Sequence, residues 1–449
     1  MKSPLQQEYQ QRRQQFMRKL SKQAQGADVV AVIPSAPMAI MHRDVEYRYR
    51  QNSDFFYLTG FDEPNAVAVL APGQKHEFVL FVQAKDPLIE TWSGRRIGVE
   101  QAQVLYGADR AFSINKLDKV LPRYLQRANQ LYYIADIDEK QDQRIFSHWK
   151  QQIHAYPKTG QGILGLTDAG RVLHEMRMHK SPLEIAQLRK AMAISIAAHQ
   201  QAHHHCVPGK HEYEIQALME QLFLSAGAES FAYPSIVASG DNACILHYIN
   251  NNHKMAQGDL LLIDAGCSVG YYNADITRTF PVGQRFTPEQ KALYEIVLAA
   301  QLAAIDAVKP GQRFHKVHSA AAKVITEGLL ELGLLRGKLK KLIKKQAWKS
   351  FFPHGTSHWL GLDVHDVGCY RDAKNPDKKS RKLCSGNVLT IEPGIYIAPD
   401  FIPAKGQPEV ADCWRGIGIR IEDNVLVTNK GHEVLTALLP KSIGAMERA

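Results

Sequence analysis

Residues 258–280 read GDLLLIDAGCSVGYYNADITRTF and predict a β-hairpin that carries acidic side chains. The apolar run 260–263 follows a Gly-Asp turn, which is typical of a buried strand. Residues 275–280 are rich in β-branched and aromatic side chains and predict a second strand. Gly266 and Gly270 suit the link between the two strands.

Two aspartates of this hairpin are expected to meet. If the turn is centred on Val269 and Gly270, Asp264 and Asp275 lie directly opposite one another across the paired strands. Like charges that are buried together need a proton or a cation between them. The hairpin therefore predicts a metal site, to which other parts of the chain should contribute ligands.

The composition is that of a globular protein of more than one domain. The chain has 449 residues, of which 45% are hydrophobic and 22% charged, and its length favours two domains. None of its six cysteines forms a Cys-x-x-Cys pair, and the first 205 residues contain none. This usage indicates a reducing compartment rather than a disulfide framework.

The N-terminal residues favour a cytoplasmic location and no membrane contact. Residues 1–20 are polar and rich in Gln and Arg, without the apolar core of a signal peptide. The best apolar run, 29–41, is interrupted by Pro34 and Pro37 and is too short to span a bilayer.

The net charge of +10 raises the alternative of a nucleic-acid-binding protein. The main basic cluster is spread over 336–349, where apolar residues recur at helical spacing. We interpret it as one amphipathic helix with a solvated basic face, because no nucleic-acid-binding motif accompanies the charge. Its cations are Arg336, Lys338, Lys340, Lys341, Lys344, Lys345 and Lys349.

The first part of the chain predicts a small α/β domain over residues 1–175. A polar helix is expected at 6–25 and another at 117–126. Strands are expected at 29–33, 55–58, 66–70, 78–82 and 131–134.

The second domain is expected over residues 176–449. Ser181-Pro182-x-Glu184 is a helix-start signature, and Thr287-Pro-Glu-Gln290 is a second one. Helices are predicted after each signature and at 212–225 and 316–332. Strand-like segments are predicted at 230–240 and 244–248. The consecutive residues His203, His204 and His205 are assigned to a helix surface or core, because neighbours on a helix do not converge on one point.

Further candidate ligands lie near the C-terminus. His354, His358 and His365 fall within twelve residues on a glycine-containing segment that predicts an irregular structure. Glu392 closes a hydrophobic strand before a Pro-Gly turn, and a carboxylate in that position needs a partner.

Residues 416–427 alternate cleanly, so Arg420 and Glu422 share one face of a predicted strand. Two interpretations are open. The face is either exposed with a local ion pair, or it supplies a carboxylate ligand and an arginine that orients it.

Four carboxylates and one imidazole form the predicted ligand set: Asp264, Asp275, His358, Glu392 and Glu422. This is too much negative charge for one divalent ion, and it suits two. Oxygen ligands with a single histidine favour Mn²⁺, Co²⁺ or Fe²⁺ over a thiolate-type zinc site.

The strings around these residues resemble the pita-bread metallopeptidases, a family that contains methionine aminopeptidase, prolidase and aminopeptidase P. The match covers nearly the whole chain and is nearest to the aminopeptidase P (Xaa-Pro aminopeptidase) branch. It rests on IDAG at 263–266, DITRTFP at 275–281, HGTSHWLGLDVHDVG at 354–368, IEPGIY at 391–396, RGIGIRIED at 415–423, YRQNSDFFYLTGF at 49–61 and WSGRRIG at 92–98.

The resemblance implies an α+β fold, with a small creatinase-like N-terminal α/β domain before a pita-bread catalytic domain. The first domain would serve oligomerisation and closure of the substrate pocket. Two Mn²⁺ per chain are implied, with Co²⁺, Fe²⁺ or Zn²⁺ as alternatives. Asp264 would bind one metal, Asp275 and Glu422 both, and His358 and Glu392 the second.

The resemblance also implies roles in catalysis. A hydroxide held between the metals would attack the scissile carbonyl, and Glu392 would carry a proton to the leaving nitrogen. His247 and His365 would bind substrate and stabilise the oxyanion. Arg420 would orient the metal-site carboxylates. The implied substrate contacts further include Tyr233, His354, Tyr396 and Trp92, the last donated by a neighbouring subunit of a homotetramer, a dimer of dimers.

The activity implied is removal of an N-terminal residue that precedes proline. The alternatives are a prolidase, which cleaves only Xaa-Pro dipeptides, and a non-catalytic peptide- or nucleic-acid-binding protein on the same fold. The expected partners are peptides with proline at the second position, with no nucleic acid and no membrane. The chain departs from the family pattern at 397–414 and in the Lys-rich segment 338–349.

Overall fold

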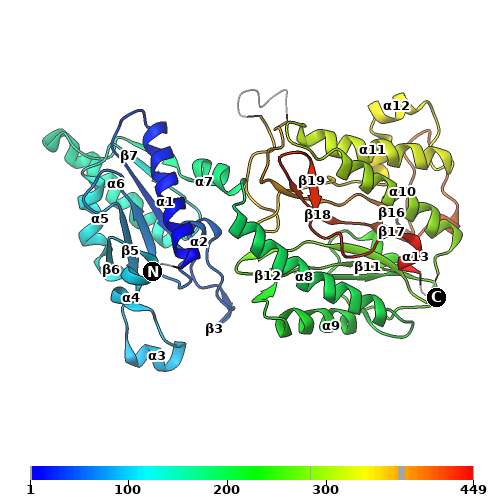
Figure 1. Ribbon diagram of the computed structural model, residues 1–449, viewed down its shortest axis with the longest axis horizontal. Helices are drawn as coiled ribbons and strands as arrows, with labels where there is room; N and C mark the ends of the chain where they lie inside the picture. The colour runs from blue at the N-terminus through cyan, green and yellow to red at the C-terminus, as the bar shows by residue number, and fades with distance from the viewer. Residues whose placement is uncertain (1–2, 284, 373–379, 448–449) are drawn as a thin grey trace. The chain divides into compact units, whose positions relative to one another are not determined.

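The computed structural model describes residues 3–283, 285–372 and 380–447, and the chain forms two compact units (Figure 1). The units are Met1–Arg177 and Met178–Ala449, a division two residues beyond the expected domain boundary. None of the described helices combines the length and hydrophobicity needed to cross a bilayer.

The first unit is built on a six-stranded mixed sheet in the order β6-β5-β4-β1-β7-β8. β4 is antiparallel to β1 and β5, whereas the β5–β6, β1–β7 and β7–β8 pairs are parallel. Every residue of β1, β4 and β5 is buried, as expected for apolar strands covered on both faces.

The elements of the first unit are β1 (Val29–Pro34), β2 (Ile40–His42), β3 (Val45–Glu46), β4 (Val67–Leu70), β5 (Phe78–Val82), β6 (Arg110–Ser113), β7 (Gln130–Tyr133), β8 (Gly165–Asp168), α1 (Pro4–Gln23), α2 (Ser53–Thr59), α3 (Pro87–Ser93), α4 (Gly98–Tyr106), α5 (Leu117–Leu125), α6 (Glu139–Thr159) and α7 (Gly170–Arg177).

One predicted strand of this unit is wrong. Residues 55–58 belong to the helix α2, not to a strand. The Asn52 side chain accepts hydrogen bonds from the backbone N–H groups of Asp54 and Phe55, and Gly60 ends the helix in the left-handed conformation. These caps outweigh the β propensity of the aromatic side chains between them.

The second unit places two helix pairs on opposite sides of short sheets. Figure 1 shows α8 (Pro182–His205) and α9 (Glu212–Ser225) on one side, with α10 (Pro288–Asp306) and α11 (Phe314–Glu331) on the other. The predicted capping boxes at Ser181 and Thr287 are both present. A short helix, α13 (Ile443–Met446), lies near the C-terminus.

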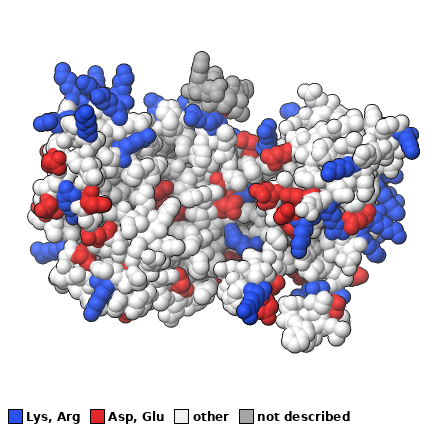
Figure 2. All heavy atoms as spheres, turned by 180° about the vertical axis from the view of Figure 1, so that it is seen from behind, with Lys and Arg blue, Asp and Glu red and all other residues white. Residues whose placement is uncertain are grey.

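The Lys-rich segment is not one continuous helix. It forms α12 (Leu339–Lys344) and the 3₁₀ turn η3 (Ala347–Ser350), separated by Gln346, whose φ of 53° is left-handed. Leu342 and Trp348 are buried, while the seven cations are exposed. Figure 2 shows basic side chains gathered at the upper left, over the part of the unit that carries α12.

The strands of the second unit form three three-stranded sheets and one two-stranded sheet. Their orders are β10 (Ile236–Ser239), β11 (Leu260–Asp264), β14 (Thr277–Pro281); β13 (Tyr272–Asn273), β12 (Cys267–Val269), β9 (Ser230–Phe231); β15 (Val388–Ile391), β18 (Asp423–Val427), β19 (His432–Val434); and β16 (Gly394–Ile397), β17 (Ile417–Arg420). The predicted strand at 244–248 is wrong, since residues 240–244 form the 3₁₀ turn η2 (Gly240–Cys244) and residues 245–247 continue as a bend and a turn.

The hairpin at 258–280 forms, but its predicted register is wrong. Asp264 pairs with Thr277 rather than with Asp275. The two-residue turn is Gly270-Tyr271, and both residues have positive φ, of 56° and 70°, as a type I′ turn requires. Centring the turn one residue later moves every pairing by two residues.

Arg278 of β14 is the most heavily bonded buried cation of this region. Its side chain is fully buried, and its five N–H groups donate to Asp423 Oδ1 and to four backbone carbonyls, those of Thr277, Glu422, Leu439 and Pro440. Burial alone would raise the pKa of Asp423, but Arg278 and Lys441 hold it below its ordinary value. The carboxylate therefore stabilises the unit above the unfolded pKa near 3.8, and this contribution is lost as the pH falls through the folded pKa.

We expect Arg278→Met to lower the free energy of unfolding of the second unit by about 3–5 kcal/mol, because it breaks a buried ion pair. Urea unfolding at pH 7 measures the change. Arg189→Met is the matched control, since Arg189 and Glu433 form an ion pair 2.7 Å long with side chains 46% and 42% exposed. That variant should lose less than about 1 kcal/mol. Equal losses would contradict the role assigned to Arg278.

Candidate metal centre

Five separate segments bring the predicted ligand set to one place. Asp264 ends β11, Asp275 lies between β13 and β14, Glu392 follows β15, and Glu422 lies between β17 and β18. His358 comes from the irregular segment that the glycines predicted. Strand ends position four of the five side chains.

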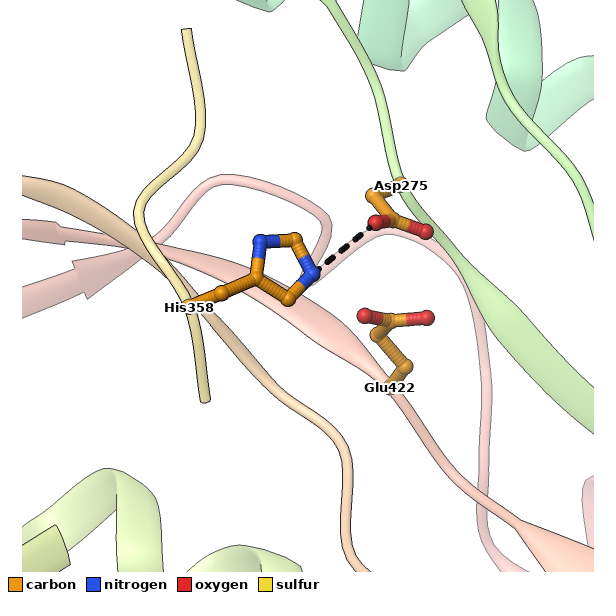
Figure 3. Close-up of side chains that lie close together, drawn as sticks. All are labelled: Asp275, His358 and Glu422. Atoms are coloured by element: carbon orange, nitrogen blue, oxygen red, sulfur yellow. Dashed lines mark ion pairs between the residues drawn. The ribbon is translucent and has the colours of Figure 1, made fainter. Parts of the chain in front are cut away.

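Three of these residues form a tight group. Asp275, His358 and Glu422 each offer a ligand atom, and these atoms lie within 4.8 Å of one another. Figure 3 shows the three side chains pointing toward one another from different segments. His358 Nε2 is 3.3 Å from Asp275 Oδ2 and 3.6 Å from Glu392 Oε1, so Glu392 borders the group.

Tyr233 connects the two aspartates of the hairpin. Its hydroxyl lies 2.6 Å from Oδ1 of Asp264 and 2.6 Å from Oδ1 of Asp275, and its single hydrogen is shared between them. Gly266 allows the hairpin to close here, because a Cβ at this position would collide with the backbone of Ala274. The expected meeting of the two carboxylates thus occurs in a register different from the predicted one.

His358 is oriented by its other ring nitrogen. Nδ1 lies 2.9 Å from the carbonyl oxygen of Trp359, a contact that a protonated Nδ1 makes as a donor. When the ring is neutral, this bond selects the tautomer in which Nε2 has a lone pair directed at the carboxylates, which is the arrangement that metal-binding histidines use.

Arg420 orients two of the ligand carboxylates, Asp264 directly and Glu422 through Thr277. Its guanidinium donates to Asp264 Oδ2 at 2.7 Å and to the Tyr396 hydroxyl at 2.9 Å, and its Nε donates to Thr277 Oγ1 at 3.2 Å. The Thr277 hydroxyl in turn donates to Glu422 Oε2 at 2.8 Å. The face that carries Arg420 is therefore buried, and the arginine pairs with Asp264 rather than with its strand neighbour.

The pKa values reflect crowded, buried negative charge. Burial is the main cause that raises the pKa of Asp264, and it raises that of Glu392 to about 7. Burial and then the charges of Asp275 and Glu392 hold the pKa of Glu422 well above its ordinary value. His358 behaves in the opposite way: burial alone would lower its pKa, but the hydrogen bond and charge of Asp275 raise it to about 9.

This donor set fits divalent cations. Four carboxylates converge, and within the described chain Arg420 is the one guanidinium or ammonium bonded to any of them. Carboxylate oxygens and an imidazole nitrogen are ligands that Mn²⁺, Co²⁺, Fe²⁺ and Zn²⁺ accept. Positive charge brought by such ions would offset the repulsion among the carboxylates.

His354 and Tyr396 form a bonded pair beside the ligand set. Since Arg420 donates to the Tyr396 hydroxyl, that hydroxyl donates its hydrogen to His354 Nε2, at 2.9 Å. His354 Nδ1 lies 2.7 Å from the Gly355 carbonyl and acts as the donor there. Burial and then the charge of Arg420 lower the pKa of His354 to about 3, so the ring is neutral.

Three other residues were predicted to contact substrate: His365, His247 and Trp92. The rings of His365 and His358 are 4.3 Å apart and edge to face. His247 is exposed, and the next residue, Tyr248, packs in one apolar cluster with Tyr396 of this group. Trp92 belongs to α3 of the first unit and is 91% exposed.

Sequence reasoning missed two residues that support the site. Thr277 joins Arg420 to Glu422, and the Asn424 side chain bonds both backbone groups of Asp275. Each lies two residues beyond a predicted ligand, at or near the start of the following strand. The alternation by two along these strings was the available signal.

Comparison with known proteins identifies relatives along the whole chain. Residues 186–429 match "Metallopeptidase family M24", and residues 9–133 match "Aminopeptidase P, N-terminal domain". The Xaa-Pro aminopeptidase of Escherichia coli K12 is 41% identical over 97% of this chain and 95% of its own length. Xaa-Pro aminopeptidase 3 of Homo sapiens is 34% identical over 98% and 85%.

Solved structures agree with the sequence relatives. Aminopeptidase PepP of Pseudomonas aeruginosa superposes with a TM-score of 0.92 at 44% identity, covering 99% of this chain and 97% of that one. A zinc-substituted E. coli aminopeptidase P solved with product gives a TM-score of 0.91 at 40% identity, covering 99% and 98%.

We expect Glu422→Ala to bind less than the wild-type amount of Mn²⁺, because the variant removes a carboxylate from the centre of the donor set. Calorimetric titration of metal-stripped protein with Mn²⁺ measures the stoichiometry and affinity. Glu433→Ala removes a half-buried glutamate of β19 that pairs with Arg189, outside the ligand set, and should titrate like the wild type. Unchanged Mn²⁺ binding by Glu422→Ala would remove Glu422 from the ligand set.

Proposed function

Because the chain belongs to metallopeptidase family M24, we propose that it is a dinuclear metal-dependent aminopeptidase that hydrolyses the N-terminal Xaa-Pro bond of peptides. The observation that carries the proposal is the convergence of four carboxylates and one histidine from five separate segments. The names of its relatives supply the substrate class.

We assign the ligands as follows. Asp264 would hold one metal, Asp275 and Glu422 would contribute to both, and His358 and Glu392 would hold the other. The tight group formed by Asp275, His358 and Glu422 supports this division, since two of its members are the assigned bridges. Bound divalent ions in such a site polarise a substrate carbonyl and lower the pKa of water.

The remaining chemistry belongs to the side chains of this chain. Glu392 turns one oxygen toward His358, at 3.6 Å, and the other toward His354, at 3.8 Å. A carboxylate placed between these two histidines can take a proton from the attacking water on one oxygen and deliver it to the proline nitrogen as the peptide bond breaks. Arg420 holds Asp264 still, and Tyr233, His354 and Tyr396 bind substrate beside the ligands.

The site also suits a bond that precedes proline. The amide nitrogen of proline carries no hydrogen, so a catalytic site for this bond cannot depend on a hydrogen bond from it. The assigned roles require none: His247 and His365 bind the peptide and stabilise the negative charge that develops on the carbonyl oxygen.

Manganese, a cytoplasmic location and a homotetramer complete the proposal. The oxygen-rich donor set favours Mn²⁺, with Co²⁺, Fe²⁺ or Zn²⁺ as alternatives. All six cysteines are free thiols, as in reducing compartments. Leu88 and Trp92 of α3 are 81% and 91% exposed, and exposed apolar side chains of this size support a subunit contact through which Trp92 closes a neighbour's pocket. The partners are peptides with proline second, with neither nucleic acid nor membrane.

We expect the Mn²⁺-loaded protein to release arginine from the tripeptide Arg-Pro-Pro, because an aminopeptidase accepts residues beyond the proline. Amino-acid analysis of the products, with the dipeptide Gly-Pro as a parallel substrate, tests the choice. The competing candidate is a dipeptidase, which the same centre could serve. Hydrolysis of Gly-Pro alone would establish that candidate and reject ours.

We expect His365→Ala to keep its bound metal but to lose about 10²–10³-fold in kcat/KM, because it removes a donor to the developing oxyanion. Metal analysis and steady-state kinetics on Arg-Pro-Pro measure the two effects. His205→Ala provides the control, since His205 lies at the exposed end of α8, and the hydrogen bond it makes among the described residues is to the Gln201 carbonyl of the same helix. Near-normal turnover by His365→Ala would refute its assigned role.

A further inference from the structure

Glu212 is a buried carboxylate outside the ligand set. It is the first residue of α9 and is completely buried. Its Oε1 accepts from the Ser239 backbone N–H at 2.6 Å and the Ser239 hydroxyl at 2.7 Å, with Asn242 Nδ2 at 3.2 Å. Its Oε2 accepts from the Tyr248 hydroxyl at 2.8 Å and the His253 backbone N–H at 2.9 Å.

All of these donors come from residues 239–253, which we call the His247 segment. Glu212 bonds the segment at three points: Ser239 at its start, Tyr248 directly beside His247, and His253 at its end. Most of the segment has no strand or helix of its own beyond η2. Its shape therefore depends on side-chain anchors.

The His247 segment borders the site. A cavity of about 460 Å³ is lined by His247, Ile245, Ile249 and other residues of this segment. His247 itself is exposed, and its neighbour Tyr248 packs in one apolar cluster with Tyr396, whose hydroxyl bonds His354 beside the ligand set. The segment thus packs against Tyr396, and it carries His247 next to the residue that makes this contact.

From this geometry we infer that Glu212 is a positioning residue, which fixes His247 for substrate binding by holding the segment that carries it. The inference rests on the proposed function, in which His247 contacts the peptide. Glu212 acts only through His247 and touches neither substrate nor metal.

Because of its hydrogen-bond pattern, Glu212 can be tested by substitution with glutamine, which has nearly the same shape. Each carboxylate oxygen accepts one backbone N–H, from Ser239 on one side and from His253 on the other. In Glu212→Gln, either orientation of the amide turns an NH₂ group toward one of these N–H donors. The variant keeps the shape of the side chain but must release one end of the segment. Asn251 still bonds Val237, Gln216 and the Ser235 carbonyl, so a second anchor remains.

The test is a double-mutant cycle of Glu212→Gln with His247→Ala, measured as kcat/KM on Arg-Pro-Pro with saturating Mn²⁺. We expect Glu212→Gln alone to lose about 10²-fold, with its metal content unchanged. In the His247→Ala background the same change should cost less than about threefold. Losses that multiply across the cycle, or normal activity of Glu212→Gln, would overturn the inference.

Two further variants keep the result interpretable. Thr326→Val removes an equally buried hydroxyl, bonded to the Ala322 carbonyl within α11, and should keep full activity. Tyr248→Phe removes one bond to Glu212, together with the contacts of the hydroxyl to Asn252 within the same segment, and serves if Glu212→Gln does not fold. Its smaller loss of activity should also vanish in the His247→Ala background. A wild-type protein that leaves Arg-Pro-Pro intact would overturn the proposed function and this inference together, whereas an active wild type with multiplying losses overturns this inference alone.

Discussion

Repulsion among four buried carboxylates is the constraint around which the second unit is arranged. Asp264, Asp275, Glu392 and Glu422 come from four strand ends, and burial in this place raises the pKa of three of them. A fold does not collect such charges without a compensating group. The described chain supplies one bonded guanidinium and one imidazole, and divalent cations supply the rest.

The same repulsion explains why hydrogen bonds and ion pairs surround the ligand carboxylates. Arg420, Thr277 and Tyr396 join the first hairpin to β16 and β17, while Arg278 and Asp423 tie β14 to β18 through a second, fully buried ion pair. The two networks use neighbouring residues of the same two segments. Arg278 follows Thr277 in one segment, and Asp423 follows Glu422 in the other. Alternate residues thus serve the metal centre and the core, as the period of a strand dictates.

The sequence predicted the α+β fold, the family and a ligand set that the structure gathers in one place. Acidic residues at the ends of apolar strands indicated the ligand set, and the resemblance of the surrounding strings to the pita-bread metallopeptidases supplied the family and the fold. The prediction failed where local signals compete. Residues 55–58 have strand-forming side chains but helix caps, and the hairpin turn moved by one residue because Tyr271 adopts positive φ, which sequence patterns seldom assign to tyrosine. The Glu212 anchor was missed because its five donors are scattered over fifteen residues with no repeating pattern.

The central claim is that two metal ions lie among these carboxylates. Diffraction from crystals of the Mn²⁺-loaded protein, recorded at the manganese absorption edge, tests it most directly. We predict two anomalous peaks per chain, both in contact with Asp275 and Glu422, one also in contact with Asp264 and the other with His358 and Glu392. A single peak, or none within this set, in crystals of catalytically active protein would contradict the account.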